Sequence, residues 1–171
     1  ESGLSTVFGC TLEGAVSEDE VVRMAVASVE AGCDEVGLAD TTGYANPEQI
    51  RRVFKKVRAA IGDKLSGAHL HNTRGLGLAN VVAALEVGVT TFDSSLGGLG
   101  GCPFAPGASG NIVTEDLVFM LEAMGLRTGI DLEKLLALRK ILEEGIPGEP
   151  LYGYVPLAGL TKGFVPASDR N

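Results

Sequence analysis

The feature that most constrains the fold of this chain is a strand-like run followed by a helix-like run, repeated four times. The strand-like runs occupy residues 4–10, 34–40, 65–71 and 89–95. Apolar residues at helical spacing follow each of them. Consecutive strand–helix units build a parallel sheet with right-handed crossover connections. The sequence therefore predicts an α/β fold around a parallel sheet.

The residues at the predicted helix starts support this division of the chain. Ser17 with Glu20 three residues later predicts a capping box, and Asn46 before Pro47 predicts a second helix start. Thr114 is a predicted cap of the fourth helix. One more helix is predicted at residues 131–145, before a tail rich in Pro and Gly. We therefore divide the chain into a barrel-type part, residues 1–144, and a tail, residues 145–171.

Two architectures fit this pattern, a (β/α) barrel and an open doubly wound sheet. Polar residues fall at the carboxyl ends of all four predicted strands, namely Cys10, Asp40, His69, His71 and Asp93. In a barrel these ends converge on one mouth, where the chemistry of that fold takes place. An open sheet usually has a Gly-rich phosphate turn after its first strand, and "GCTLEG" does not match that motif. We predict the (β/α) TIM-barrel type, with four βα units forming half a barrel.

Composition limits the possible partners. The formal net charge is -8, which disfavours nucleic acid and anionic membrane surfaces. No apolar run reaches the roughly 18 residues that a membrane span needs. The three cysteines are odd in number and widely spaced, which favours free thiols in a reducing compartment. We expect a bacterial cytoplasm, or the mitochondrial matrix in a eukaryote.

The only two histidines, His69 and His71, lie two residues apart at the end of a predicted strand. Residues at this spacing point to the same face, so two imidazoles can bind one divalent ion. The ordinary alternative is one buried, hydrogen-bonded histidine beside an exposed one. Asp40 at the same level of the preceding strand favours the metal interpretation, and Asn111 offers an amide oxygen. Imidazole with oxygen donors suits Mg²⁺, Mn²⁺ or Zn²⁺.

A glycine-rich stretch at residues 95–111 contains Cys102. Its ordinary interpretation is a flexible surface loop. A thiol on mobile backbone beside a barrel mouth can instead serve as an acid or a base. The stretch lacks the Gly-Lys-Ser/Thr ending of a phosphate-binding loop, so nucleotide hydrolysis is not predicted.

Several segments resemble the 3-hydroxy-3-methylglutaryl-CoA lyase family, over about residues 4–136. They are "VFGCTLEG", "EVGLADTTGYANP", "HLHNTRGLGLANVVAALEVGV" and "DSSLGGLGGCPFAPGASGNIVTEDL". The resemblance implies a TIM barrel that cleaves its acyl-CoA substrate to acetyl-CoA and acetoacetate with Mg²⁺ or Mn²⁺. The His-x-His strand end is shared with other metallolyase barrels, whereas the Gly-Gly-Cys-Pro loop is specific to this family.

The resemblance also implies roles for individual residues. The implied metal ligands are His69, His71 and Asn111, the implied catalytic residues are Cys102, Asp40 and His69, and the residues implied to contact substrate or support the site are Glu115, Asn72 and Thr73. Asn72 departs from the family, because an Asp is common at that position. Asp93 is expected to hold a loop or to support the site from behind the ligands.

The resemblance covers only the C-terminal half of the family's barrel. The family's N-terminal half carries an Arg-Asp pair, so we expect the site of this chain to lack one carboxylate ligand and one cation. The expected partners are an acyl-CoA substrate and either the missing N-terminal half or a second copy of the chain. Three alternatives stay open: a lyase for a related acyl-CoA such as citramalyl-CoA, an inactive half-barrel, and an acetyl-CoA-using synthase or pyruvate-type aldolase. The Gly-Gly-Cys-Pro loop speaks against the third.

Overall fold

The computed structural model describes residues 1–101 and 110–170. Two compact units form within the chain. The first unit contains Glu1–Asp93 and Gly100–Asn111, and the second contains Ser94–Leu99 and Ile112–Asn171. The predicted boundary at residue 144 falls inside the second unit.

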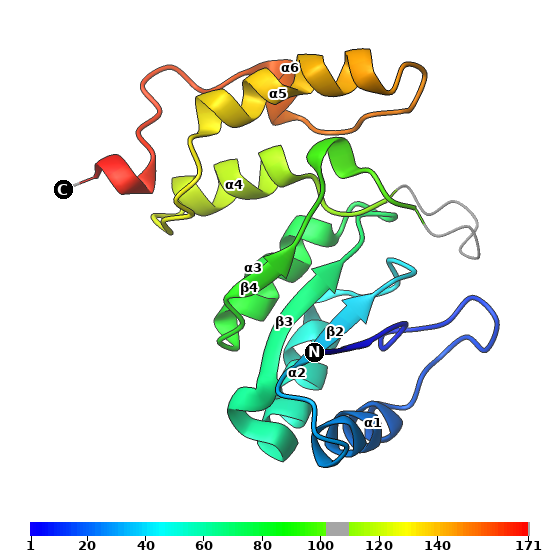
Figure 1. Cartoon of the computed structure of the whole chain (residues 1–171). Helices are drawn as coiled ribbons and strands as arrows, with labels where there is room; N and C mark the ends of the chain where they lie inside the picture. Colours follow the sequence, from blue (N-terminus) through cyan, green and yellow to red (C-terminus); the bar gives the residue numbers. More distant parts are fainter. Residues whose placement is uncertain (102–109, 171) are drawn as a thin grey trace. The chain divides into compact units, whose positions relative to one another are not determined.

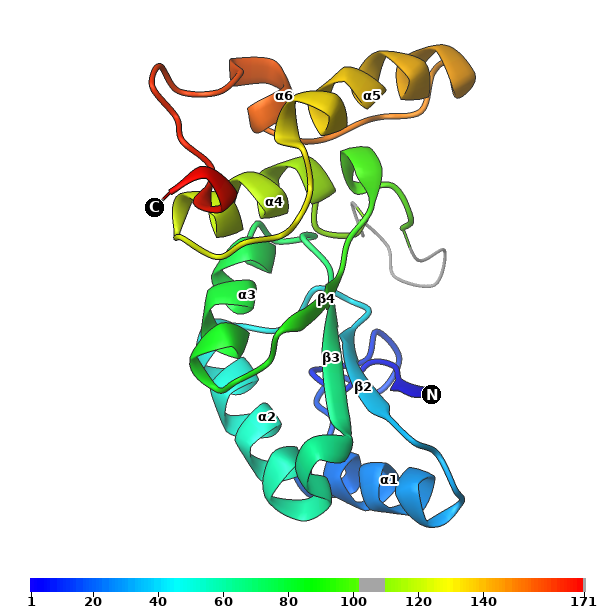
Figure 2. The same cartoon turned by 60° about the vertical axis from the view of Figure 1, so that its left-hand side comes forward.

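The first unit is a four-stranded parallel sheet with its strands in chain order. The strands are β1 (Ser2–Leu4), β2 (Val36–Asp40), β3 (Leu65–Leu70) and β4 (Thr91–Asp93), and the helices between them are α1 (Glu18–Glu30), α2 (Pro47–Ile61) and α3 (Gly77–Glu86). All three helices run along the same side of the sheet (Figures 1 and 2). A doubly wound sheet would have helices on both faces and a reversal of strand order. The arrangement therefore confirms the predicted barrel type.

The core of the first unit lies between the sheet and these helices. The predicted apolar stripe of α2 is buried, and Phe54 is fully excluded from solvent. The Phe54 ring stacks on Phe8, with the ring centroids 6.3 Å apart. From the sheet, Leu38 and Leu70 are buried on the helix-covered side. Alternation along each strand leaves the other face for polar and small side chains.

One of the three predicted helix caps is confirmed. Asn46 forms a complete capping box with Gln49 at the start of α2. Ser17 is the N-cap residue of α1 but its side chain makes no cap hydrogen bond, and the Glu20 carboxylate pairs with Arg23. The predicted cap of α4 (Thr114–Ala123) is also wrong: its N-cap is Val113, and the Thr114 hydroxyl bonds Ser94.

The prediction of a first strand at residues 4–10 was wrong. The observed strand, β1, ends at Leu4, where the predicted strand begins. Residues 5–8 form a turn in which Thr6 adopts a positive φ of 57°. Val7 and Phe8 are buried in this turn, so their apolar character reflects the core and not a strand. Cys10 lies in an isolated bridge with Gly14 and not at a strand end. The other three predicted strands are confirmed, although β4 is shorter than expected.

The second unit contains α4, α5 (Leu132–Gly145) and the short α6 (Val155–Ala158). Its apolar core joins Val118 of α4 to Leu132 and Leu135 of α5. Phe164, from the segment after α6, packs on Phe119 with the ring centroids 5.0 Å apart. No helix among the described residues is both long and apolar enough to cross a lipid bilayer.

We expect Asn46→Ala to lower the free energy of unfolding by about 1 kcal/mol, because the backbone N–H groups of Glu48 and Gln49 lose their acceptor. Urea unfolding followed by circular dichroism measures this loss. Asn46→Asp keeps a side-chain acceptor and should retain most of the stability. An alanine variant as stable as the wild type would contradict the capping assignment.

Candidate active site

The two histidines meet at the carboxyl end of β3. His69 is in the strand and His71 follows it, and their Nε2 atoms lie 3.2 Å apart. The ring centroids are 5.2 Å apart, with the planes tilted by 54°. His71 is buried, whereas His69 is partly exposed. The pair therefore directs two ring nitrogens at one point, as the spacing in the sequence predicted.

The environment of His71 favours a neutral ring. Burial lowers the pKa of His71, and the neighbouring His69 lowers it further. Its Nδ1 atom is buried and has no hydrogen-bond partner among the described residues. Neutral imidazole is the form of histidine that binds metal ions, since a ring nitrogen then carries a free lone pair.

Asp93 of β4 lies behind His69. The two residues are neighbours in the parallel register, and Asp93 Oδ2 is 3.2 Å from His69 Nδ1. A carboxylate in this position keeps the proton on Nδ1 and leaves the Nε2 lone pair free. This contact matches the supporting role expected of Asp93.

The backbone of Asn111 lies beside His71. The two residues form an isolated antiparallel bridge, and the Asn72 N–H donates to the Gly110 carbonyl at 3.1 Å. Gly100 approaches the Asn111 amide so closely that a Cβ on Gly100 would lie 2.7 Å from Nδ2. The structure thus brings together His69, His71 and Asn111 within the first unit. No group of three or more His, Cys, Asp or Glu residues in the described ranges could hold a metal ion.

The structure does not bring Asp40 to the histidines. Asp40 pairs with Leu70, the residue between His69 and His71, so its side chain leaves the sheet on the helix-covered face. Its Oδ1 atom accepts from the Tyr44 N–H at 2.8 Å and the Ala45 N–H at 3.1 Å. Burial raises the pKa of Asp40, partly offset by these N–H groups. The catalytic role of Asp40 stays a prediction, while its visible contacts hold the turn after β2.

Asn72 and Thr73 form the loop after β3. Asn72 Oδ1 accepts from the Gly77 N–H at 3.0 Å and so supports the start of α3. Thr73 packs against Gly43, where an added Cβ would lie 2.6 Å from the Thr73 Cβ. Their contacts connect neighbouring loops, and their contact with substrate stays a prediction.

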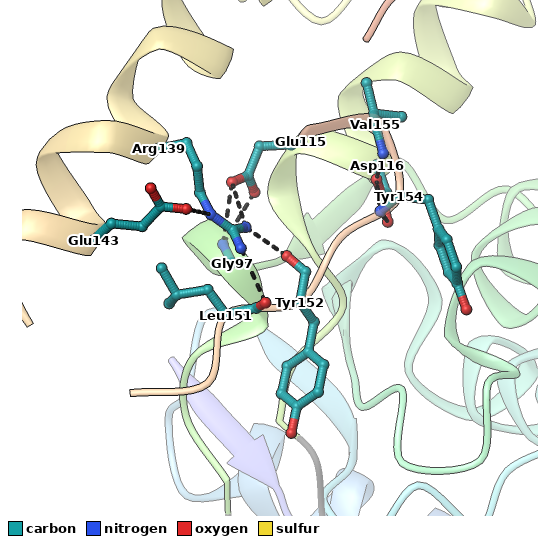
Figure 3. A network of polar contacts seen from close by, with 9 residues as sticks. All are labelled: Gly97, Glu115, Asp116, Arg139, Glu143, Leu151, Tyr152, Tyr154 and Val155. Atoms are coloured by element: carbon teal, nitrogen blue, oxygen red, sulfur yellow. Dashed lines mark hydrogen bonds and ion pairs between the residues drawn. The ribbon is translucent and has the colours of Figure 1, made fainter. Parts of the chain in front are cut away.

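Glu115 lies in the second unit, where Figure 3 shows its network. The side chain is fully buried, and both carboxylate oxygens accept from the Gly97 N–H, at 3.2 and 3.1 Å. Arg139 Nη1 is 4.0 Å from Glu115 Oε1. The same arginine donates to the carbonyls of Leu151 at 2.9 Å and Tyr152 at 2.7 Å. Glu115 and Arg139 therefore connect the segment after α5 to Gly97, near the start of the glycine-rich stretch at residues 95–111.

Cys102, the predicted catalytic cysteine, lies outside the described residues. The sequence analysis did not single out Arg139 or Arg74. The signal for Arg139 was its place in the predicted helix at residues 131–145, four residues before Glu143. Arg74 is the basic residue of the His-x-His loop.

Comparison with known proteins gives a consistent result. The model of the HMGL-like family matches residues 1–142. The chain is 50% identical over 148 residues to hydroxymethylglutaryl-CoA lyase YngG of Bacillus subtilis, covering 86% of this chain and 49% of that protein. It is 45% identical over 156 residues to (R)-citramalyl-CoA lyase of Chloroflexus aurantiacus, covering 91% of this chain and 49% of that protein. The chain thus spans about half the length of these relatives.

Solved structures agree with the fold. An HMG-CoA lyase from Acinetobacter baumannii, in complex with coenzyme A and 3-methylmalate, superposes with a TM-score of 0.88 at 48% identity. The match covers 96% of this chain and 53% of that one. The carboxyl transferase domain of Rhizobium etli pyruvate carboxylase matches with a TM-score of 0.67 at 23% identity, over 84% of this chain and 23% of that one, and shows the fold alone. The family resemblance and the TIM-barrel type predicted from the sequence are confirmed.

We expect Arg139→Met to lower the free energy of unfolding of the second unit by about 2 to 4 kcal/mol, because it leaves the buried Glu115 carboxylate and two carbonyls without their cation. Urea unfolding and limited proteolysis of the tail measure the effect. Arg127→Met, at an exposed arginine, is the matched control and should change stability by less than about 0.5 kcal/mol. Equal stability of the two variants would contradict this role of Arg139.

Proposed function

Since this chain belongs to the HMGL-like family, we propose that it forms half of a divalent-metal-dependent carbon–carbon lyase. Its substrate is 3-hydroxy-3-methylglutaryl-CoA, which it cleaves to acetyl-CoA and acetoacetate by a retro-Claisen reaction. The observation that carries this proposal is the His69–His71 pair with Asp93 behind it. The lyase names of the relatives from Bacillus subtilis and Pseudomonas mevalonii support the substrate.

The donor atoms fit a divalent ion. Two imidazole nitrogens that bind one ion at right angles lie about 3 Å apart, since each metal–nitrogen bond is about 2.1 Å long. The observed separation of the two Nε2 atoms is 3.2 Å. Asn111, next to His71, is proposed as the third ligand through its amide oxygen. When bound, Mg²⁺ or Mn²⁺ would stabilise the negative charge on the substrate oxygen during cleavage.

Two groups of this chain are proposed to accept the proton of the tertiary hydroxyl, Asp40 and the Asp93 carboxylate that is linked to His69. The sheet geometry favours Asp93, because Asp93 and His69 share the face that carries His71. His69 orients this carboxylate through Nδ1–H, since its Nε2 lone pair is assigned to the metal ion. The carbon–carbon bond then breaks, and its electron pair forms the enolate of acetyl-CoA. Cys102 is proposed to donate the proton that converts the enolate carbon to the methyl group of acetyl-CoA.

The two imidazoles and one amide do not make a complete metal site. We propose that the remaining ligand and a cation come from the N-terminal half of the barrel or from a second copy of this chain. The face of the sheet opposite α1, α2 and α3 supports this, because no helix of the first unit covers it among the described residues. The compartment is proposed to be the cytoplasm of a bacterium, or the mitochondrial matrix if the source is eukaryotic. Two relatives, from Bacillus subtilis and Bos taurus, illustrate these alternatives, the latter being named mitochondrial.

A second candidate is the cleavage of citramalyl-CoA, favoured by the 45% identity to the Chloroflexus aurantiacus enzyme over 91% of this chain. The same bond cleavage would give acetyl-CoA and pyruvate. Product analysis with both substrates, with Mn²⁺ or with EDTA, distinguishes the two candidates. Metal-dependent formation of acetoacetate supports the main proposal, and pyruvate alone supports the alternative. A folded chain that releases neither product favours the inactive half-barrel.

We expect His71→Ala to abolish Mn²⁺ binding, because it removes one of the two converging nitrogens. Titration calorimetry and the electron paramagnetic resonance signal of free Mn²⁺ both measure binding without any turnover. Cys33→Ala, a cysteine outside the proposed site, is the control for a general effect of substitution. Unchanged Mn²⁺ binding by a folded His71→Ala variant would contradict the proposed metal site.

Cys102→Ala should reduce acetyl-CoA release at least about 100-fold, the usual contribution of a general acid, and leave Mn²⁺ binding unchanged. Release is measured with the wild-type chain and the variant under the conditions in which the wild type is active. Cys33→Ala again serves as the control and should keep full turnover. Wild-type turnover by Cys102→Ala would remove the cysteine from the mechanism.

A further inference from the structure

Three loops at the carboxyl ends of the strands form a stack in the first unit. The Arg74 guanidinium lies over the Tyr44 ring, with Cζ 4.5 Å from the ring centroid. The Tyr44 ring in turn packs against Gly9, where an added Cβ would lie 2.6 Å from Tyr44 Cδ2. Only glycine fits at this position, since its φ is also +150°. Gly9, Tyr44 and Arg74 follow β1, β2 and β3 respectively.

Hydrogen bonds hold the guanidinium in this position. Arg74 Nη1 donates to the carbonyls of Thr42 at 3.2 Å and Gly43 at 3.1 Å. The Thr42 hydroxyl donates to the Gly9 carbonyl at 2.9 Å, which ties the first two loops together. The arginine is thus already ordered before any ligand arrives, which reduces the entropy cost of binding.

The guanidinium keeps two donor positions available. Arg74 Nε and Nη2 have no acceptor among the described residues; Asp40 interacts electrostatically with Arg74, but the two form no ion pair within 4.0 Å. The side chain belongs to an exposed residue. The loop residues 5–17, 41–46 and 71–76 contain no other Lys or Arg. Arg74 is therefore the cation of these three loops, three residues after His71.

We propose that Arg74, stacked on Tyr44, is a binding subsite for an oxyanion of the acyl-CoA substrate. An arginine with a free pair of N–H donors binds carboxylate and phosphate oxygens through two parallel hydrogen bonds. The oxyanion belongs either to the acyl carboxylate or to a phosphate of coenzyme A. This inference rests on the proposed function, which supplies the substrate class.

The test measures ligand binding to the 171-residue chain by titration calorimetry. Free 3-hydroxy-3-methylglutarate carries the carboxylates without phosphate, coenzyme A carries the phosphates without the acyl carboxylate, and pantetheine carries neither. Arg74→Gln should weaken binding of one of the two anions about tenfold or more, the loss of a charged hydrogen bond, and leave pantetheine unchanged. The anion that is affected identifies its source.

Further variants separate the subsite from a general loss of folding. Arg74→Lys keeps the charge without the paired donors and should recover part of the affinity. Tyr44→Phe keeps the ring and should bind as the wild type does, whereas Tyr44→Leu should weaken the same anion. Arg127→Gln, at an exposed arginine of the second unit, is the matched control and should have no effect. Circular dichroism checks that each variant is folded.

Several outcomes would overturn the proposal. The first is equal affinity of the wild type and Arg74→Gln for both anions. The second is an equal loss of affinity for pantetheine, or an equal loss of anion affinity in Arg127→Gln. The third is that the wild type binds neither anion. Mn²⁺ binding measured on the same samples separates this result from the proposed function. Arg74-dependent anion binding without Mn²⁺ binding would leave the subsite standing and remove the metal-dependent reaction, and the reverse result would remove the subsite alone.

Discussion

The alternation of side chains along β3 is the constraint on which the candidate site depends. Leu70 is fully buried on the helix-covered side, and His69 and His71 on either side of it point to the opposite face. A shift of register by one residue would expose Leu70 and bury both imidazoles without partners. The apolar core therefore fixes the position of the ring nitrogens. Burial of Leu70 both stabilises the unit and sets the geometry of the site. The β4 register adds Asp93 beside His69 by the same mechanism.

The carboxylates of α4 show how an acidic chain uses buried charge. Glu115, Asp116 and Glu122 are all buried, and each accepts backbone N–H groups from segments distant in sequence. Asp116 holds Tyr154 and Val155, while Glu122 holds Thr128 and Ala167. A buried carboxylate is tolerated only when its oxygens are satisfied, so these contacts order a tail that has little regular structure of its own. Sequence analysis placed Glu115 near the candidate site, but the partner that it holds depends on tertiary packing.

Prediction from sequence succeeded where one local rule decided the structure and failed where tertiary contacts competed with it. No other contact among the described residues competes with the capping role of Asn46 before Pro47, and Asn46 caps α2 as predicted. Ser17 with Glu20 had a similar local signal, but the Glu20 carboxylate accepts from Arg23 and the capping box does not form. The run from Ser5 to Cys10 has strand-like composition, yet Val7 and Phe8 satisfy their apolar character inside a turn. The level of Asp40 along its strand was predicted, but its face was not considered, although Asp40 alternates in phase with the buried Val36 and Leu38.

The incomplete donor set and the open face of the sheet have one explanation under the proposed function. Parallel sheets are normally covered on both faces, and within the described residues of the first unit helices cover only one. The open face carries small residues, Gly37, Ala39 and Gly67, beside the histidines. Side chains from a second half-barrel would fill this face and reach the two Nε2 atoms in the same step. Assembly of the barrel would then complete the metal site, so that binding of the ion and closure of the sheet stabilise each other by linkage.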